Sequence, residues 1–181
     1  MFLLMPLGRV EDAIQELRSA EEVDPRSAEL HYALNLALRA TKRFDDADFH
    51  CRQVAEDDLQ QNTCWAETFL RQGNPGEAVR TAEAAWNGHL LTMGAAWLGV
   101  VYARAGHRAD AERIAATMPH PASKAVIFAS LGDKDRTFEV LEQMVPMGPT
   151  RVGRDLIAPE YAVLHGDPRL SSIRKKSGLP E

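Results

Sequence analysis

The stretch AAWLGVVYARAGHRADAERIA, residues 95–115, carries the pattern that decides the fold. Its first half is dense in alanine and glycine, its middle holds the turn-forming Gly106, and its second half returns to apolar residues at helical spacing. Apolar residues three and four apart mark one face of a helix. The stretch therefore predicts two helices joined by a tight turn, with small side chains that let a neighbouring helix approach closely.

The turn in this stretch has four counterparts elsewhere in the chain. Each copy begins with glycine or lysine and has a small residue five positions later; the copies begin at Gly8, Lys42, Gly73, Gly106 and Gly132. They lie 34, 31, 33 and 26 residues apart. Self-similarity at a period of about 34 residues indicates stacked copies of one structural unit.

Helices are predicted between the turns. After the first turn, apolar residues recur at three- and four-residue spacing: Val10, Ala13, Ile14, Leu17 and Ala20. Pro25 ends that helix, because proline disfavours the helical conformation of the residue before it. No long alternating run of β-branched or aromatic residues is present, so we expect an all-α protein.

The composition is that of an ordinary globular chain. The 181 residues include 45% hydrophobic and 26% charged side chains, and the formal net charge is −5. A negative balance disfavours nucleic-acid binding, which relies on lysine and arginine at phosphates. No run of about 20 apolar residues occurs, so no association with a membrane is expected. Two cysteines make no disulfide framework, and the N-terminus lacks a secretory signal, so we expect a cytoplasmic location.

These features resemble the tetratricopeptide repeat (TPR) family from about residue 7 to about residue 145. The family pattern is W-x2-L-G-x2-Y, then A-x3-F, then P. Leu98, Gly99 and Tyr102 match its first part, and Ala111 to Ala115 stand at the A-x3-F positions, with alanine in place of Trp and Phe. The resemblance implies a right-handed α-solenoid of about five helix pairs, whose concave face is lined by the first helix of each pair.

The expected domain organisation follows from the repeats. Residues 1–146 are expected to form the array, with an incomplete first repeat because only about seven residues precede its turn. Residues 147–181 are expected to form a connecting segment and a C-terminal capping helix of the same domain. Asp167 and Pro168 suit the start of this helix, and Gly178 suits its end. This tail also resembles the C-terminal TPR segment of bacterial multidomain regulators.

The resemblance implies a non-enzymatic scaffold that binds a protein or peptide on the concave face. Outward-pointing positions of the first helices give the candidate groove residues: Tyr32, Leu36, Arg39, Glu67, Leu70, Arg71, Trp97, Val100 and Arg104. The three arginines lie at equivalent places in successive repeats. Stacked, they form a ladder for the carboxylate of an acidic peptide, since guanidinium binds carboxylate as a bidentate fork. Alternatively, they are solvated side chains near helix C-termini.

Other assignments remain open at this stage. Trp97 is either a groove anchor or a side chain packed between repeats. TPR domains that clamp acidic C-termini use lysine and asparagine at set groove positions, and this chain lacks that set, because Asn35 falls on the buried side. Cys51 and Cys64 fall on adjacent helices and are expected to be a pair of buried thiols, with a regulatory disulfide as the alternative.

Two further functions compete with peptide binding. One is self-association as a homodimer, in which the incomplete N-terminal repeat stacks on a second copy. The other is an enzyme on a helical-repeat scaffold, but no catalytic arrangement stands out, so we expect no enzyme and no cofactor. The histidines show no metal-ligand spacing, so no metal site is predicted; they are His31, His50, His89, His107, His120 and His165.

Overall fold

The computed structural model describes residues 4–53, 59–86 and 93–180. In these ranges all regular structure is helical and no strand occurs, so the expected all-α class is confirmed. The α-helices are α1 (Val10–Val23), α2 (Ala28–Ala40), α3 (Phe44–Cys51), α4 (Leu59–Arg71), α5 (Pro75–Trp86), α6 (Met93–Arg104), α7 (Arg108–Thr117), α8 (Pro121–Ser130), α9 (Lys134–Met144), α10 (Pro149–Leu156) and α11 (Pro168–Lys176). Short 3-10 helices are η1 (Met5–Leu7), η2 (Val145–Met147) and η3 (Pro159–Leu164). Among the described helices, none has the length and apolar character needed to cross a bilayer.

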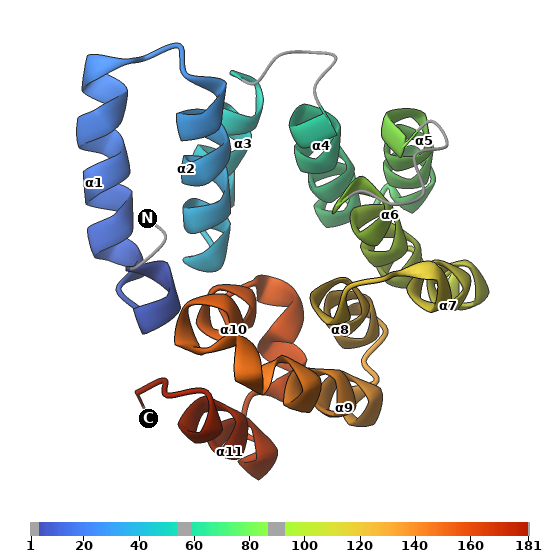
Figure 1. Cartoon of the computed structure of the whole chain (residues 1–181). Helices are drawn as coiled ribbons and strands as arrows, with labels where there is room; N and C mark the ends of the chain where they lie inside the picture. The colour runs from blue at the N-terminus through green and yellow to red at the C-terminus, as the bar shows by residue number, and fades with distance from the viewer. Residues whose placement is uncertain (1–3, 54–58, 87–92, 181) are drawn as a thin grey trace.

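The helices follow one another around a curve. From α1 to α9, each helix packs on the next one in sequence, and Figure 1 shows this path bending so that α10 and α11 return towards the N-terminal end. The even-numbered helices α2, α4, α6 and α8 also contact one another in order. These four helices carry the candidate groove residues or lie beside them, so they position the site.

At each recurring turn, a helix ends at a residue whose backbone adopts the left-handed conformation. Gly106 has a φ of 87°, and the N–H of His107 bonds back to the carbonyl oxygen of Tyr102 at 2.8 Å. This is the hydrogen bond of a glycine C-cap, which glycine favours because it has no Cβ to clash. In the second copy, Lys42 adopts a φ of 61° at the same place, and it is the only non-glycine residue with positive φ in the described ranges. The sequence period is therefore a period of helix termini.

Three apolar clusters make the core. One joins α1 to α3 around Leu34 and Leu38, a second joins α4 to α8 around Leu98 and Val101, and a third joins α8 to α11 around Leu141. In the second cluster α6 approaches its neighbours closely, because a Cβ on Gly99 would lie 2.6 Å from a side-chain carbon of Ile127. The predicted close approach at the small residues of α6 is confirmed there.

A helix, α11, forms in the tail of the chain, and the tail also contacts the first elements. Asp167 caps α11, accepting a hydrogen bond from the N–H of Arg169, and Gly178 follows the helix with positive φ. The tail also docks on the first elements of the chain, since α10 packs on η1 and Ile157 packs against the cluster of α1 to α3. A Cβ on Gly153 would lie 2.6 Å from the carbonyl oxygen of Pro6.

We predict that Gly153→Ala destabilises the protein by about 1–3 kcal/mol, because the added methyl group meets backbone rather than a yielding side chain. Gly76→Ala is the matched control: Gly76 lies in the first turn of α5, and nothing lies within 4 Å of the position of its Cβ. Chemical denaturation of both variants measures the difference. Equal stability of the two variants would show that the first and last elements do not pack closely.

Candidate functional site

Four of the candidate groove residues converge on the inner helices. Arg39 lies near the end of α2, Glu67 in α4, and Trp97 and Arg104 in α6. The guanidinium carbon of Arg39 lies 5.3 Å from the centroid of the Trp97 ring, within the range of a cation–π contact. Two arginines, a carboxylate and an indole ring from three helices therefore share one place.

A second carboxylate completes this charged cluster. Arg39 Nη2 lies 3.3 Å from Glu67 Oε2 and 3.3 Å from Glu160 Oε1. Arg104 Nη1 donates to Glu67 Oε2 and lies 3.9 Å from Glu160 Oε1. The side chains of Arg39, Glu67 and Glu160 are 6%, 7% and 3% exposed, whereas that of Arg104 is 30% exposed. We call these four residues the inner ion cluster; Arg104 is its open side.

The ionised state of the cluster follows from its pairing. Burial pushes the pKa of Glu67 upwards, but the positive charges of Arg39 and Arg104 more than offset this, and the pKa is lowered from its ordinary value. Burial also opposes the charge of Arg104, but its hydrogen bond to Glu67 raises its pKa. Opposite charges at hydrogen-bond distance favour the charged form of both partners.

Glu160 is the member of the cluster that the sequence did not indicate. It lies in η3, which begins at Pro159 and buries the side chains of Tyr161 and Leu164. Burial, followed by the charges of Asp155 and Glu160, raises the pKa of Tyr161 well above its ordinary value, so the phenol is neutral. The only signal in the sequence was its place after Pro159, which can begin a helix, and before an apolar segment. These residues lie in the part of the chain that was expected to be a connecting segment.

Two donors at the cluster have no acceptor among the described residues. Arg39 Nε and Trp97 Nε1 are both buried and lack a hydrogen-bond partner there. A buried N–H without a partner costs free energy, so such groups call for an explanation. Arg39 Nε belongs to the guanidinium group that pairs with both carboxylates, and the Trp97 ring lies against that same group.

The remaining candidates lie elsewhere or are covered. Arg71 turns towards α3, where it pairs with Asp48 and stacks 4.8 Å from the centroid of the Phe44 ring. The expected ladder of three arginines is thus a pair, because Asp48 holds the third. Val100 is fully buried in the core and does not reach a groove surface. The other three are half-buried: Tyr32, Leu36 and Leu70.

The buried residues named from sequence lie as expected. Asn35 is buried, and its side-chain amide donates to the carbonyl oxygen of Ala47 at 2.9 Å, so it is not a groove residue. Cys51 and Cys64 are both buried, and neither forms a disulfide in the part of the chain that the structure describes. A hydrogen bond to Cys64, with burial second, raises the pKa of Cys51, so the two thiols are neighbours and the thiol of Cys51 stays protonated.

Two histidines that appeared scattered in the sequence come together. His31 and His50 lie against each other and against Glu21 at one end of the first helices. Burial lowers the pKa of His50, and the neighbouring His31 acts in the same direction, against the opposing effect of Glu21. The partners are ten and nineteen positions from His31, which no standard ligand motif spans.

We predict that Glu67→Gln lowers the free energy of unfolding at neutral pH by about 3 kcal/mol, because it leaves buried arginine charge underpaired. The variant should also change the acid response. Since the folded pKa of Glu67 lies below its ordinary 4.5, its stabilisation is present above that pH and is lost as pH falls through the folded value.

Denaturant titrations between about pH 7 and pH 3 test this, and the wild type should lose more stability than Glu67→Gln over that range. Glu16→Gln, at an exposed position of α1, is the control and should behave like the wild type. Parallel pH profiles of the wild type and Glu67→Gln would contradict a stabilising charge at Glu67.

Comparison with known proteins adds no family to this picture. No model of a known protein family matches the chain. A search of curated proteins finds no match either. What the chain does therefore has to be inferred from the contacts described above.

Proposed function

We propose that this chain is a TPR-like right-handed α-solenoid that binds a protein or peptide on its inner face and carries out no chemistry. Support comes from the contacts of α2, α4, α6 and α8 with one another, while each also packs on its sequence neighbours. In this view the pairs are α2–α3, α4–α5, α6–α7 and α8–α9, and α1 packs on the first of these pairs through α2. Repeat arrays of this kind present extended concave binding surfaces.

The ligand chemistry follows from the inner ion cluster. Arg39 and Arg104 offer guanidinium groups to a carboxylate, and Trp97 offers a large apolar surface beside them. A peptide with an acidic side chain next to an aromatic or aliphatic one fits both. The two unpartnered donors, Arg39 Nε and Trp97 Nε1, are buried, so they would have to be uncovered before they could bond to an acceptor on such a peptide.

One observation carries the proposal: the chain itself supplies a carboxylate to this place from a remote segment. Glu160 reaches Arg39 across 121 positions of sequence, on a short 3-10 helix rather than from the array. An acidic residue followed by buried Tyr161 docks there as a partner peptide would. Because Glu160 is 3% exposed, an external ligand must displace this segment.

The alternative, self-association through the first repeat, has less support. Stacking on a second copy needs an apolar outer face on α1, because terminal repeats with polar faces end an array. Most exposed side chains of α1 are polar: Glu11, Asp12, Gln15, Glu16, Arg18, Ser19 and Glu22. Val23, the last residue of the helix, is the exposed apolar exception. This surface suits a cap better than an interface between copies.

Peptide competition tests the proposed function. A fluorescent peptide with the sequence of residues 157–166 is titrated with protein, and anisotropy reports binding. Glu160→Gln protein should bind it about tenfold more tightly than the wild type, because the tethered competitor is weakened. Trp97→Ala in that background should cost more affinity than Arg104→Gln, since a partly exposed charge pair contributes little alone. Binding should weaken as salt is added.

The controls separate this site from general charge. Arg80→Gln, at an exposed arginine of α5, should leave binding unchanged. A peptide with glutamine at the position of Glu160 should bind weakly to every variant. The proposed function is wrong if the acidic and glutamine peptides bind equally, or if Glu160→Gln protein, folded by circular dichroism, binds no better than the wild type.

A further inference from the structure

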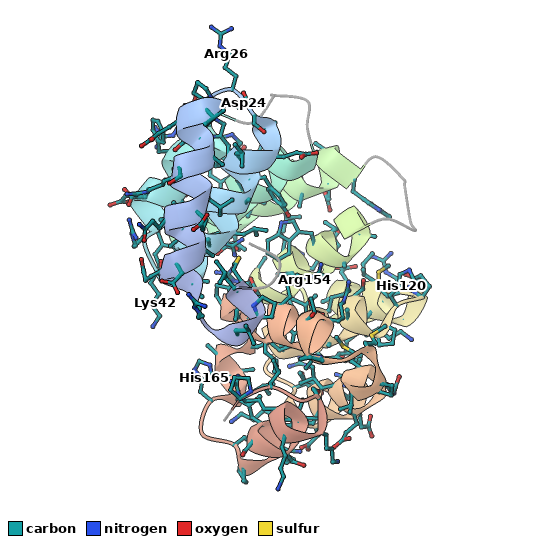
Figure 2. The ribbon with its side chains drawn as sticks, turned by 60° about the vertical axis from the view of Figure 1, so that its left-hand side comes forward. Asp24, Arg26, Lys42, His120, Arg154 and His165 are labelled. Atoms are coloured by element: carbon teal, nitrogen blue, oxygen red, sulfur yellow. The ribbon has the colours of Figure 1, made fainter. Side chains whose placement is uncertain are left out.

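Three potential metal ligands meet at the end of the first helices, away from the inner ion cluster. Glu21 lies near the end of α1, His31 in the first turns of α2, and His50 in the last turn of α3. Figure 2 shows this end of the molecule through Asp24 and Arg26, which lie in the loop between α1 and α2. His31 and His50 are 4% and 6% exposed, and Glu21 is half-buried.

The three ligand atoms form a nearly equilateral triangle. The Nδ1 atoms of His31 and His50 are 3.1 Å apart, and Glu21 Oε1 lies 3.3 Å from the first and 3.4 Å from the second. Ligands of a tetrahedral zinc ion, at about 2.0–2.1 Å from the metal, are about 3.3 Å from one another. The triangle therefore already has the dimensions of one face of a zinc coordination shell.

A hydrogen bond outside the triangle orients one of the ligands, His31. His31 Nε2 lies 3.1 Å from the carbonyl oxygen of Pro25, which only accepts, so this nitrogen carries a proton and Nδ1 of a neutral ring keeps its lone pair. A backbone carbonyl on the far nitrogen is the usual partner of a metal-ligating histidine. When both rings are neutral, at most one proton lies between the three ligand atoms, and this proton can bridge only one edge of the triangle.

A divalent cation satisfies all three atoms at once. We propose that Glu21, His31 and His50 bind a zinc ion through Oε1 and the two Nδ1 atoms, with the fourth position open to water. Imidazole and carboxylate together suit zinc better than magnesium or calcium, which prefer oxygen ligands. Because each ligand comes from a different helix, the ion would join α1 to α2 and α3.

Zinc titration of the metal-free protein tests the site. Protein treated with a chelator and exchanged into metal-free buffer at neutral pH competes with a chromophoric zinc indicator. One equivalent of zinc should bind, and saturation should raise the Tm by about 5 °C, since a ligand that binds only the folded state stabilises it. His50→Gln and Glu21→Gln should each weaken zinc binding by about 100-fold.

Matched variants separate this site from other zinc ligands in the chain. His120→Gln removes an exposed histidine that lies far from this loop in Figure 2, and it should bind zinc like the wild type. Cys51→Ala with Cys64→Ala removes the buried thiols and should also retain the site. Glu21→Gln keeps the test valid if His50→Gln fails to fold, because Glu21 is the most exposed ligand.

The outcomes are distinct. Loss of binding in the two ligand variants and its retention in the histidine and cysteine controls supports the site. The proposal is overturned if the metal-free protein takes up no stoichiometric zinc, if Glu21→Gln binds as tightly as the wild type, or if the cysteine variant loses the ion.

Discussion

The interior of this protein contains buried arginine and glutamate side chains whose charges are balanced by one another. A buried ion is tolerated when a counter-ion lies beside it, and it is costly when one partner is missing. Arg39, Glu67, Arg104 and Glu160 come from α2, α4, α6 and η3, so the four charges pair only when all four elements are in register. The apolar contacts between helices tolerate small shifts, but a hydrogen-bonded ion cluster does not. The arrangement of α2, α4 and α6 therefore depends on the docking of η3.

Much of the fold could be predicted because short segments of sequence determine where the helices begin and end. A positive-φ residue such as Gly106 stops a helix through bonds to the preceding turn, and the same turn recurs at nearly constant spacing. The capping of α11 by Asp167 is equally local. Small residues such as Gly99 indicated close contacts between helices. Such a contact can be predicted without knowing which residue of the neighbouring helix makes it.

The candidate site could be predicted only in part, because pairing depends on distant residues. The helical spacing of the sequence predicted that four residues share one region: Arg39, Glu67, Trp97 and Arg104. This spacing does not predict which carboxylate pairs with which arginine. Arg71 lies at a similar place near the end of α4, yet its guanidinium group pairs with Asp48 on α3. Glu160, His31 and His50 were missed for the same reason: their partners lie on other elements, and the spacing in sequence between them has no fixed value.

The contact of α10 with η1 determines how this protein should lose its structure. In an open row of repeats each unit touches only its neighbours, so the ends fray and stability is nearly a sum over units. Here Gly153 lies against the backbone of Pro6 and Ile157 against the first apolar cluster, so the two ends cover each other. Opening either end exposes surface at both. Amide hydrogens of the first and last described helices should then exchange together, through one cooperative opening, rather than by independent fraying.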